Sequence, residues 1–552
     1  MDVYVQGKKV RLTQAEFKAQ GGEGAVYVKG DTAYKVYADP AKMIPAAKIR
    51  ELSVLTLPDI VRPREVLLDA GRAAVGYTMR SVPDGLALCR TFPRAFRERA
   101  GLTQDKALRL VQRLQEGVKH VHAQGLLLVD LSEMNFLVDS AFEHVFFIDV
   151  DSYQTGGFAA TALTESVRDR HAAGFCQGTD WFSFAVVSFQ MFVGIHPYKG
   201  KHPSLKTLDE RMRGNVSVLD PAVSVPAACL PFDVIPQAYR EWYQAVLERG
   251  RRVPPPEDAH ALIVLPPQAR PPAGSGQVTI TQTLQCAGSI VSFTRGVAVS
   301  VEGIYLSGRR CAEAGAGTQV GLTPQGHAVR ATLEAGKLRL FDLTDGCGIA
   351  VDAAGEQVVG ADGRLYVKQG ASLLEIGFLE TPYKILPRLE PVGTVLENAT
   401  QLFEGVALQS LLGAWYASLL PGPGRCHQVR LPEMDGFQVI DAKLQGGVLM
   451  VVAARAGGFA KFIFRFDAAY ALYDARTVLD LSTPGVNFTV LDSGVCLHLN
   501  DSECLEVFPV CMGAAGLRVV SDPALGGDCL LLHDGARALF ARGNALYQFT
   551  MR

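Results

Sequence analysis

Four polar residues in the first half of the chain have the types needed to hold a metal–triphosphate complex and transfer a phosphoryl group. Asp130 and Asn135 are five positions apart between apolar runs, so one loop could hold a carboxylate that receives a hydroxyl proton and an amide oxygen that ligates a metal. Asp149 ends the apolar run 145–148, where a carboxylate is poorly solvated unless it meets a cation such as Mg²⁺. Lys35 lies in a β-type apolar run and could reach nucleotide phosphates.

A glycine-rich stretch, AQGGEGAVY, precedes this lysine. Gly21, Gly22 and Gly24 would let a strand–turn–strand backbone approach phosphate oxygens without interference from Cβ atoms. The lysine also needs a carboxylate to hold it. Glu51, in the helical stretch 46–55, is the best-placed candidate.

Each of these features also has an ordinary structural explanation. The glycines suit a simple hairpin, and Lys35 suits a solvated strand position. Asp130 and Asn135 suit a turn, Asp149 suits a strand-end cap, and Glu51 suits a surface helix. The shared order of the glycines, the lysine, the Asp/Asn loop and the strand-end aspartate is what favours one phosphate-binding centre.

The elements that would position these residues are a mixture of strands and helices. Residues 106–122 place apolar side chains at spacings of three and four, which predicts an amphipathic helix, and residues 238–248 predict another. The longest apolar run, 181–195, is shorter than the roughly 18–20 residues that span a bilayer, so a buried helix is expected. Proline clusters and a closing Gly-Ser-Gly mark 253–276 as a linker.

With these motifs in this order, about residues 10–255 resemble the eukaryotic-type protein kinase fold. The three glycines match its glycine-rich loop, although Ala19 replaces the first glycine of that pattern. The resemblance implies that Lys35 is the strand lysine, Asp130 the catalytic-loop aspartate, Asn135 the metal-binding asparagine and Asp149 the metal aspartate of the DFG motif. Its implied cofactors are ATP and Mg²⁺.

The same resemblance assigns residues outside the catalytic centre. Met79 falls at the gatekeeper position, and the segment from Arg80 to Val82 falls at the hinge whose backbone would bond adenine. Asp180 matches the buried aspartate that braces the catalytic loop, and GIHPY at 194–198 resembles the turn after the helix that follows it.

The sequence also departs from the kinase pattern. Leu128 and Val129 stand where HRD has His and Arg, so control by activation-loop phosphate is not expected. Ser132 replaces the usual lysine, so transfer is expected to be slow, and Asp151 replaces the DFG glycine. The sequence contains no recognisable APE motif, so it gives no support for the peptide-docking platform of that fold. The segment IDVDSYQ most resembles a divergent bacterial group found beside PP2C-type phosphatases and von Willebrand A-type proteins in tellurite-resistance-associated systems.

The resemblance therefore implies an ATP- and Mg²⁺-dependent kinase that phosphorylates Ser or Thr of a protein substrate, with PP2C-type and von Willebrand A-type proteins as partners. A nucleotide-binding pseudokinase that acts as a scaffold is one alternative. A small-molecule phosphotransferase of the aminoglycoside-kinase kind, which shares the Asp-x4-Asn and metal-Asp pattern, is another.

Composition limits the remaining possibilities. A length of 552 residues predicts more than one domain: a kinase-like domain over 1–252, with lobes over about 1–82 and 83–252, and a second domain over 277–552. The net charge of −2 disfavours nucleic acid as a partner. Eleven cysteines without a CxxC pair, and a start without a signal-peptide pattern, are typical of a cytoplasmic protein with reduced thiols and no membrane span.

The second half reads as an all-β domain. Short apolar runs alternate with Gly, Asp and Asn, as in DGRLYV at 362–367 and GNALYQF at 543–549. About 275 residues at roughly 40–50 per four-stranded blade predict a β-propeller of five to seven blades, with a large sandwich or two smaller β domains as alternatives. His427 beside Cys426 suits a loop or core pair better than a metal site. We expect this domain to dock partner or substrate proteins.

Overall fold

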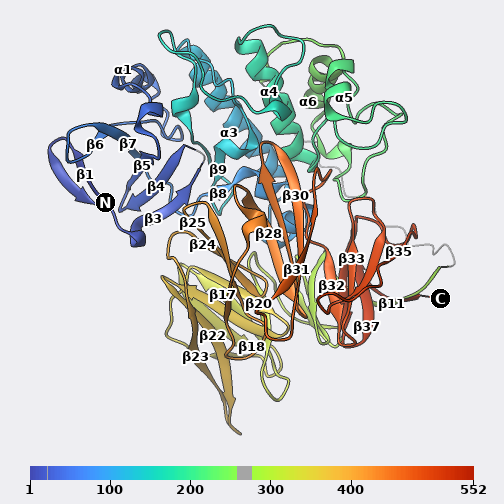
Figure 1. The fold of residues 1–552 in the computed structure, drawn as a ribbon. Helices are drawn as coiled ribbons and strands as arrows, with labels where there is room; N and C mark the ends of the chain where they lie inside the picture. The colour runs from blue at the N-terminus through green and yellow to red at the C-terminus, as the bar shows by residue number, and fades with distance from the viewer. Residues whose placement is uncertain (22, 258–276, 552) are drawn as a thin grey trace. The chain divides into compact units, whose positions relative to one another are not determined.

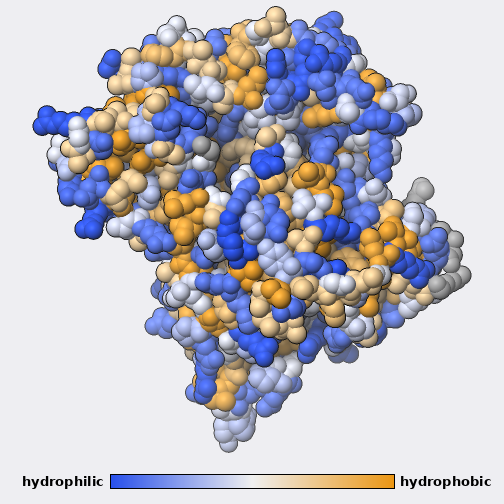
Figure 2. All heavy atoms as spheres, viewed as in Figure 1, coloured by the Kyte–Doolittle hydropathy of each residue, from blue (hydrophilic) through white to orange (hydrophobic). Residues whose placement is uncertain are grey.

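The computed structural model describes residues 1–21, 23–257 and 277–551. These residues form two compact parts, drawn mainly from 1–257 and from 277–551 (Figure 1). The first part mixes helices and strands and the second is built from strands, as the sequence predicts at this level. Hydrophilic residues cover most of the visible surface, and hydrophobic residues appear there as scattered patches (Figure 2).

The first part begins with a seven-stranded antiparallel sheet in the order β2-β1-β6-β7-β5-β4-β3. Its central strand β5 buries five of its six residues, because neighbours pair on both of its edges. The strands are β1 Asp2–Val5, β2 Lys8–Arg11, β3 Phe17–Gln20, β4 Gly24–Lys29, β5 Thr32–Tyr37, β6 Val66–Leu68 and β7 Ala74–Arg80. A short helix, α1 Ala46–Glu51, and a 3₁₀ turn over Leu52–Val54 follow β5.

The rest of this part is mostly helical, with one small sheet in the order β10-β9-β8. The predicted helices at 106–122, 181–195 and 238–248 are confirmed as α3, α4 and α6, the last continuing into a π-turn over Gln244–Glu248. The elements are β8 Leu86–Ala87, α3 Gln104–Ala123, β9 Phe136–Val138, β10 Val145–Phe147, α4 Gln177–Val193, α5 Leu208–Gly214 and α6 Gln237–Tyr243. Helix α2, Arg94–Ala100, belongs from residue 95 on to the second part.

Helix α4 is the centre of this helical region. Every residue from Thr179 to Val193 is buried, which is the burial of a core helix apolar on all sides. It ends at Gly194, whose φ of 81° is left-handed and whose Cβ would lie 2.6 Å from the Phe92 carbonyl oxygen. Within the described residues, no helix has the length and apolar character that crossing a membrane requires.

The predicted linker 253–276 lies mostly outside the described residues, which stop at 257 and resume at 277. Its first residues are fastened to the first part. The Val253 carbonyl accepts a hydrogen bond from Trp242 Nε1 at 3.0 Å, and the Pro256 carbonyl accepts one from Gln115 Nε2 at 2.9 Å. The described start of this segment is therefore an extension of the first part.

The second part consists of seven sheets with four strands each. Six sheets use four consecutive strands, and the seventh joins the first strand, β11, to β36–β38. The strands are β11 Val278–Gln285, β12 Ile290–Thr294, β13 Val297–Ser300, β14 Ile304–Leu306, β15 Arg309–Ala312, β16 Gln319–Leu322, β17 Ala328–Glu334, β18 Lys337–Asp342, β19 Cys347–Ile349, β20 Gln357–Ala361, β21 Arg364–Gln369, β22 Ser372–Glu380, β23 Ile385–Thr394, β24 Thr400–Phe403, β25 Val406–Leu411, β26 Ala414–Leu419, β27 His427–Arg430, β28 Gln438–Gln445, β29 Val448–Arg455, β30 Gly458–Phe466, β31 Tyr473–Val478, β32 Phe488–Leu491, β33 Val495–Leu499, β34 Leu505–Pro509, β35 Arg518–Val520, β36 Cys529–Asp534, β37 Arg537–Arg542 and β38 Ala545–Met551.

Successive sheets of this part share hydrophobic cores. The sheet of β16–β19 packs on that of β20–β23 through Val329 and Leu365, and each later sheet packs on the next in chain order. The series returns to its start, because the sheet of β36–β38 packs on that of β12–β15 through Leu539 and Ala298. The sheet of β12–β15 then packs on that of β16–β19. Each sheet thus buries both faces against neighbours.

Candidate active site

The turn between β3 and β4 carries the glycines predicted to approach phosphates. The Gly21 amide donates to the Gly24 carbonyl at 2.9 Å, which closes the turn. A Cβ on Gly24 would lie 2.2 Å from the Val36 carbonyl oxygen, so β4 can pair with β5 at this point only with glycine. Gly21 has open space around the position of a Cβ. Gly22, the third predicted glycine, lies outside the described residues.

The Lys35 ammonium lies among three carboxylates. Its Nζ is 2.6 Å from Asp151 Oδ2, 3.0 Å from Asp149 Oδ1 and 3.1 Å from Glu23 Oε2. The lysine is only 8% exposed on β5, and the Tyr37 hydroxyl donates to the same Asp151 oxygen at 2.6 Å. The structure thus brings Lys35 and Asp149 together as expected, and it adds Glu23, Asp151 and Tyr37, which the sequence analysis did not assign to the site.

These charges set the ionisation of the cluster. Burial raises the pKa of Asp149 to about 6, although Lys35 works in the opposite direction. Burial also acts to raise the pKa of Asp151, but Lys35 and Tyr37 outweigh it and hold that pKa below its ordinary value. Burial alone would lower the pKa of Lys35, yet Asp151 and Asp149 raise it well above the usual range. The ammonium and Asp151 therefore form a charged pair.

Asp130 and Asn135 lie in one loop, as predicted. The Asn135 Nδ2 donates to the Asp130 backbone carbonyl at 2.9 Å and to the Asp130 Oδ2 at 3.0 Å. These bonds use the nitrogen of the side-chain amide, so its oxygen, Oδ1, remains for a cation. Asp130 Oδ1 accepts from the Thr164 backbone amide at 2.6 Å. The apolar run 126–129 before this loop is not a strand; it forms an isolated bridge between Leu127 and Gln154.

Backbone contacts join this loop to the lysine cluster. The Ile148 backbone amide donates to the Asn135 backbone carbonyl at 3.0 Å, so Asn135 lies beside the residue that precedes Asp149. The backbone is left-handed at Asp149, with φ 58°, and at Val129, with φ 65°. Such conformations are unfavourable for residues other than glycine, and they are typical of functional sites.

Asp180 braces the loop from the first turn of α4. Its Oδ2 accepts from the Leu128 amide and its Oδ1 from the Val129 amide, both at 2.9 Å, while His122 Nε2 lies 2.9 Å from Oδ2. The aspartate is fully buried. The brace expected from the sequence is confirmed, and it holds Val129 in its left-handed conformation beside Asp130.

The prediction that Glu51 holds Lys35 is wrong. Glu51 Oε2 accepts a hydrogen bond from the Gly157 backbone amide at 3.1 Å, and Lys35 is bound instead by the three carboxylates described above. The error has a physical reason. Asp151, two residues after Asp149, already occupies the place beside the Lys35 ammonium. Glu51, the last residue of α1, instead bonds to the segment that follows Asp151 in the chain.

The predicted hinge lies at the end of β7. Arg80, the last residue of β7, pairs with Thr32 on β5, and its guanidinium lies 5.3 Å from the ring centroid of Phe146. A Cβ on Gly85 would lie 3.0 Å from Val82 Cγ1 and 2.9 Å from Leu137 Cδ1. Arg80 and Val82 thus lie beside the strands that carry Lys35 and that follow Asn135.

An ion pair between buried Asp169 and half-buried Arg252, which the sequence analysis missed, anchors the segment after Asp151. Arg252 binds Asp169 with two hydrogen bonds, Nε to Oδ2 at 2.5 Å and Nη2 to Oδ1 at 2.7 Å. No motif signalled this pair, because its members lie 83 positions apart. The segment is also held at its start, where Gln154 and Leu127 exchange backbone hydrogen bonds at 3.0 and 3.1 Å.

Oxygen ligands suitable for Mg²⁺ gather beside Lys35. One oxygen each of Glu23, Asp149 and Asp151 lies within 4.8 Å of the others, and carboxylate oxygens are the donors that Mg²⁺ prefers. The sequence analysis expected Asn135 and Asp149 as the metal pair. Among the carboxylates of the described residues, Asp149 is joined in this group by Glu23 and Asp151.

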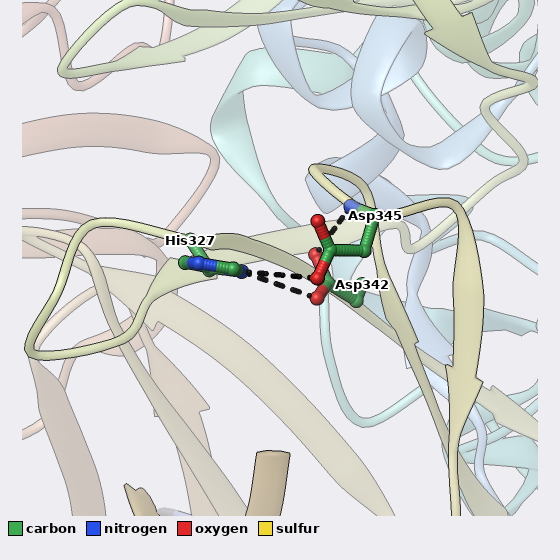
Figure 3. Close-up of side chains that lie close together, drawn as sticks. All are labelled: His327, Asp342 and Asp345. Carbon is green, nitrogen blue, oxygen red and sulfur yellow. Dashed lines mark hydrogen bonds and ion pairs between the residues drawn. The ribbon is translucent and has the colours of Figure 1, made fainter. Parts of the chain in front are cut away.

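A polar cluster in the second part surrounds His327. His327 Nδ1 lies 3.3 Å from Asp342 and 3.9 Å from Asp345 (Figure 3), but Asp342 Oδ1 also accepts from the backbone amides of Thr344 and Asp345, as in a polar turn. His427 stacks on Tyr470 with ring centroids 5.5 Å apart, which agrees with a packing role.

A further polar cluster is buried between β30, β33 and β34. Lys461 Nζ lies 3.0 Å from His498 Nε2, and His498 Nδ1 lies 3.1 Å from Glu506, which also binds Arg476 and Asn500. Burial lowers the pKa of His498 to about 4. This histidine is therefore neutral in the folded protein at pH 7.

Comparison with known proteins adds no family to this geometry. No family model matches the chain, and no curated protein matches it.

Proposed function

We propose that the first part is a protein-kinase-like, two-lobed domain that transfers a phosphoryl group from ATP, with Mg²⁺, to Ser or Thr of a protein. One observation carries the proposal. Lys35 on the sheet and Asp149 after β10, 114 positions apart, meet at 3.0 Å, and Asp149 follows directly on the residue bonded to the Asn135 loop. A phosphate-binding lysine, a metal-binding aspartate and a hydroxyl-orienting aspartate are the parts that phosphoryl transfer needs.

Each residue has a separate task in this proposal. Lys35 would bind the α- and β-phosphates, and Asp149 and Asn135 would ligate Mg²⁺, which neutralises charge on the transferring group. Asp130 would accept a hydrogen bond from the acceptor hydroxyl and orient it toward the phosphate. Arg80 and Val82 would offer backbone groups to adenine. Catalysis then rests on positioning and on charge stabilisation, without a covalent intermediate.

The anchored segment between Gln154 and Asp169 supports a protein acceptor. It brings the Thr164 amide to Asp130 at 2.6 Å, so its backbone runs past the group that would orient the hydroxyl. The Asp169–Arg252 pair and the Gln154–Leu127 bonds fix both ends of the segment. Loops fixed on a rigid scaffold are common binding surfaces. The segment could therefore serve the docking role for which the sequence offers no APE motif.

For the second part we propose a seven-bladed β-propeller that docks partners, among them substrates, PP2C-type phosphatases or von Willebrand A-type proteins. Seven four-stranded sheets that pack in a closed series support it, as does the way β11 completes the sheet of β36–β38. Pull-downs with the full chain and with a chain ending before residue 277 test the docking role. Equal recovery of partners by both would contradict it.

The kinase proposal is tested by transfer of the γ-phosphate of radiolabelled ATP to the protein or to an added substrate. We expect time-dependent labelling by the wild type, loss of labelling in Lys35→Ala and Asp149→Ala, and normal labelling in the control Lys9→Ala, whose side chain is exposed. Labelling that persists in Asp149→Ala would refute the proposal.

The pseudokinase scaffold remains the second candidate, because the Lys35 ammonium is fully engaged by carboxylates and Ser132 is not a lysine. Stabilisation by ATP without turnover would favour it. Consumption of ATP only when an aminoglycoside, choline or a sugar is added would favour the small-molecule phosphotransferase.

A further inference from the structure

A second lysine near the carboxylate cluster has no role in the proposed function so far. Lys48, on α1, is 1% exposed, and among the described residues its Nζ has no hydrogen-bond partner. Lysine almost always keeps its ammonium in water or pairs it with a carboxylate, because a buried charge without a partner is strongly destabilising. A buried, unpartnered ammonium therefore calls for an anionic partner that binds there.

The position of α1 directs Lys48 toward the proposed nucleotide site. Lys48 and Glu51 are three residues apart and share one face of the helix. Glu51 accepts the hydrogen bond from Gly157, in the segment that follows Asp151, so this face is turned to that segment. The burial of Lys48 lowers its pKa, while the charges of Asp151, Glu23 and Glu51 oppose that change. Asp151 and Glu23 are two of the carboxylates that bind Lys35.

The two lysines differ in the partners that the protein itself supplies to them. The three hydrogens of the Lys35 ammonium are matched by three carboxylates, at 2.6, 3.0 and 3.1 Å. The Lys48 ammonium has all its donors free among the described residues. A polyphosphate that enters beside the acidic cluster brings several oxygen acceptors, and an ammonium binds such oxygens with charge-assisted hydrogen bonds.

We propose that Lys48 is a second phosphate-binding residue of the nucleotide site, donating from α1 to the polyphosphate of ATP or ADP. This inference rests on the proposed function, because it takes the cluster around Lys35 to be a nucleotide site. Lys48 binds the ligand and is not the group that activates the acceptor. Its ammonium would add the positive charge that the phosphates need beside three carboxylates.

Calorimetric titration of the full-length protein with ATP, ADP and adenosine, in the presence of Mg²⁺, tests the proposal. Lys48→Met keeps a long apolar side chain without the charge, and Lys42→Met removes an exposed lysine from the preceding turn as a control. We expect Lys48→Met to weaken ATP and ADP binding about tenfold or more, the loss of a charged hydrogen bond, and to leave adenosine binding unchanged. Lys42→Met should bind all three as the wild type does.

Thermal unfolding separates this role from a structural one. Without nucleotide, Lys48→Met should melt at or above the wild-type temperature because it removes a buried, unpartnered charge, and its stabilisation by ATP should be smaller. A lower melting temperature together with an equal loss of adenosine binding would overturn the proposal. So would wild-type ATP affinity in Lys48→Met while Lys35→Met binds weakly, and the proposed function would then stand. If the wild type binds no ATP, both fail.

Discussion

Replacing Asp151 by asparagine tests whether this residue, in place of a helix glutamate, positions Lys35. The Asp151 carboxylate makes the shortest of the three contacts to the ammonium, at 2.6 Å, and the two residues are 2% and 8% exposed. Asparagine has nearly the same shape and keeps an oxygen that can accept from the Tyr37 hydroxyl. The substitution therefore removes the charge and little else.

The magnitude follows from what remains around the ammonium. A hydrogen bond to a charged group contributes a net ~1.5–3 kcal/mol. Asp149 and Glu23 still lie 3.0 and 3.1 Å from Lys35, so the lost stabilisation of the bound phosphates should fall at the low end of this range. A loss of ~1.5 kcal/mol corresponds to about a tenfold change in a binding constant. Because the lysine binds phosphates in the ground state as well as in transfer, we expect the KM for ATP to rise about tenfold and kcat to fall less.

Initial rates of phosphoryl transfer, measured against ATP concentration, give both constants. The control Asp233→Asn removes an exposed carboxylate in a turn far along the chain and should behave as the wild type. Melting temperatures of both variants show whether the fold is retained. A KM for ATP that stays at the wild-type value in folded Asp151→Asn would refute the assignment of Asp151 as the residue that positions Lys35.

Three further predictions follow from contacts in the two parts. Glu51→Gln should leave the KM for ATP within twofold of the wild-type value, because Glu51 binds the Gly157 amide and not Lys35; a tenfold rise would restore the helix-glutamate role. Asp180→Ala should destabilise the first part by ~3 kcal/mol or more and lower its melting temperature, since two buried backbone amides and His122 lose their acceptor; an unchanged melting curve would contradict the brace. His498, buried with its pKa lowered to about 4, is stabilising only while neutral, so stability should fall as pH drops from about 6.5 toward 4, by up to ~3 kcal/mol, and His498→Gln should lose much of this acid sensitivity in equilibrium unfolding.

The sequence predicts elements whose signals are local. The helix at 106–122 shows its period in its own residues, and the segments 362–367 and 543–549 each begin with turn residues, so each element appears close to its predicted place. The sheet order is different in kind. That β11 would pair with β38 depends on residues about 270 positions apart, such as Val278 and Met551, and no local pattern specifies it.

The candidate site divides in the same way. Lys35, Asp130, Asn135 and Asp149 could be selected because each lies in a recognisable run of residues. The partner of Lys35 could not, because the choice between Glu51 and Asp151 depends on which carboxylate the folded backbone brings to the ammonium. The only feature of the sequence that pointed to Asp151 was its place two residues after Asp149, at the end of the same apolar strand.

The most direct test of the shared centre is the Mg²⁺ dependence of ATP binding, measured by calorimetry with the wild type and Asp149→Asn. If Lys35, Asp149 and the Asn135 loop form one metal–triphosphate site, Mg²⁺ should tighten ATP binding to the wild type by at least tenfold, and this gain should disappear in Asp149→Asn. Equal Mg²⁺ dependence in both proteins, or no binding of ATP by a folded wild type, would contradict the account.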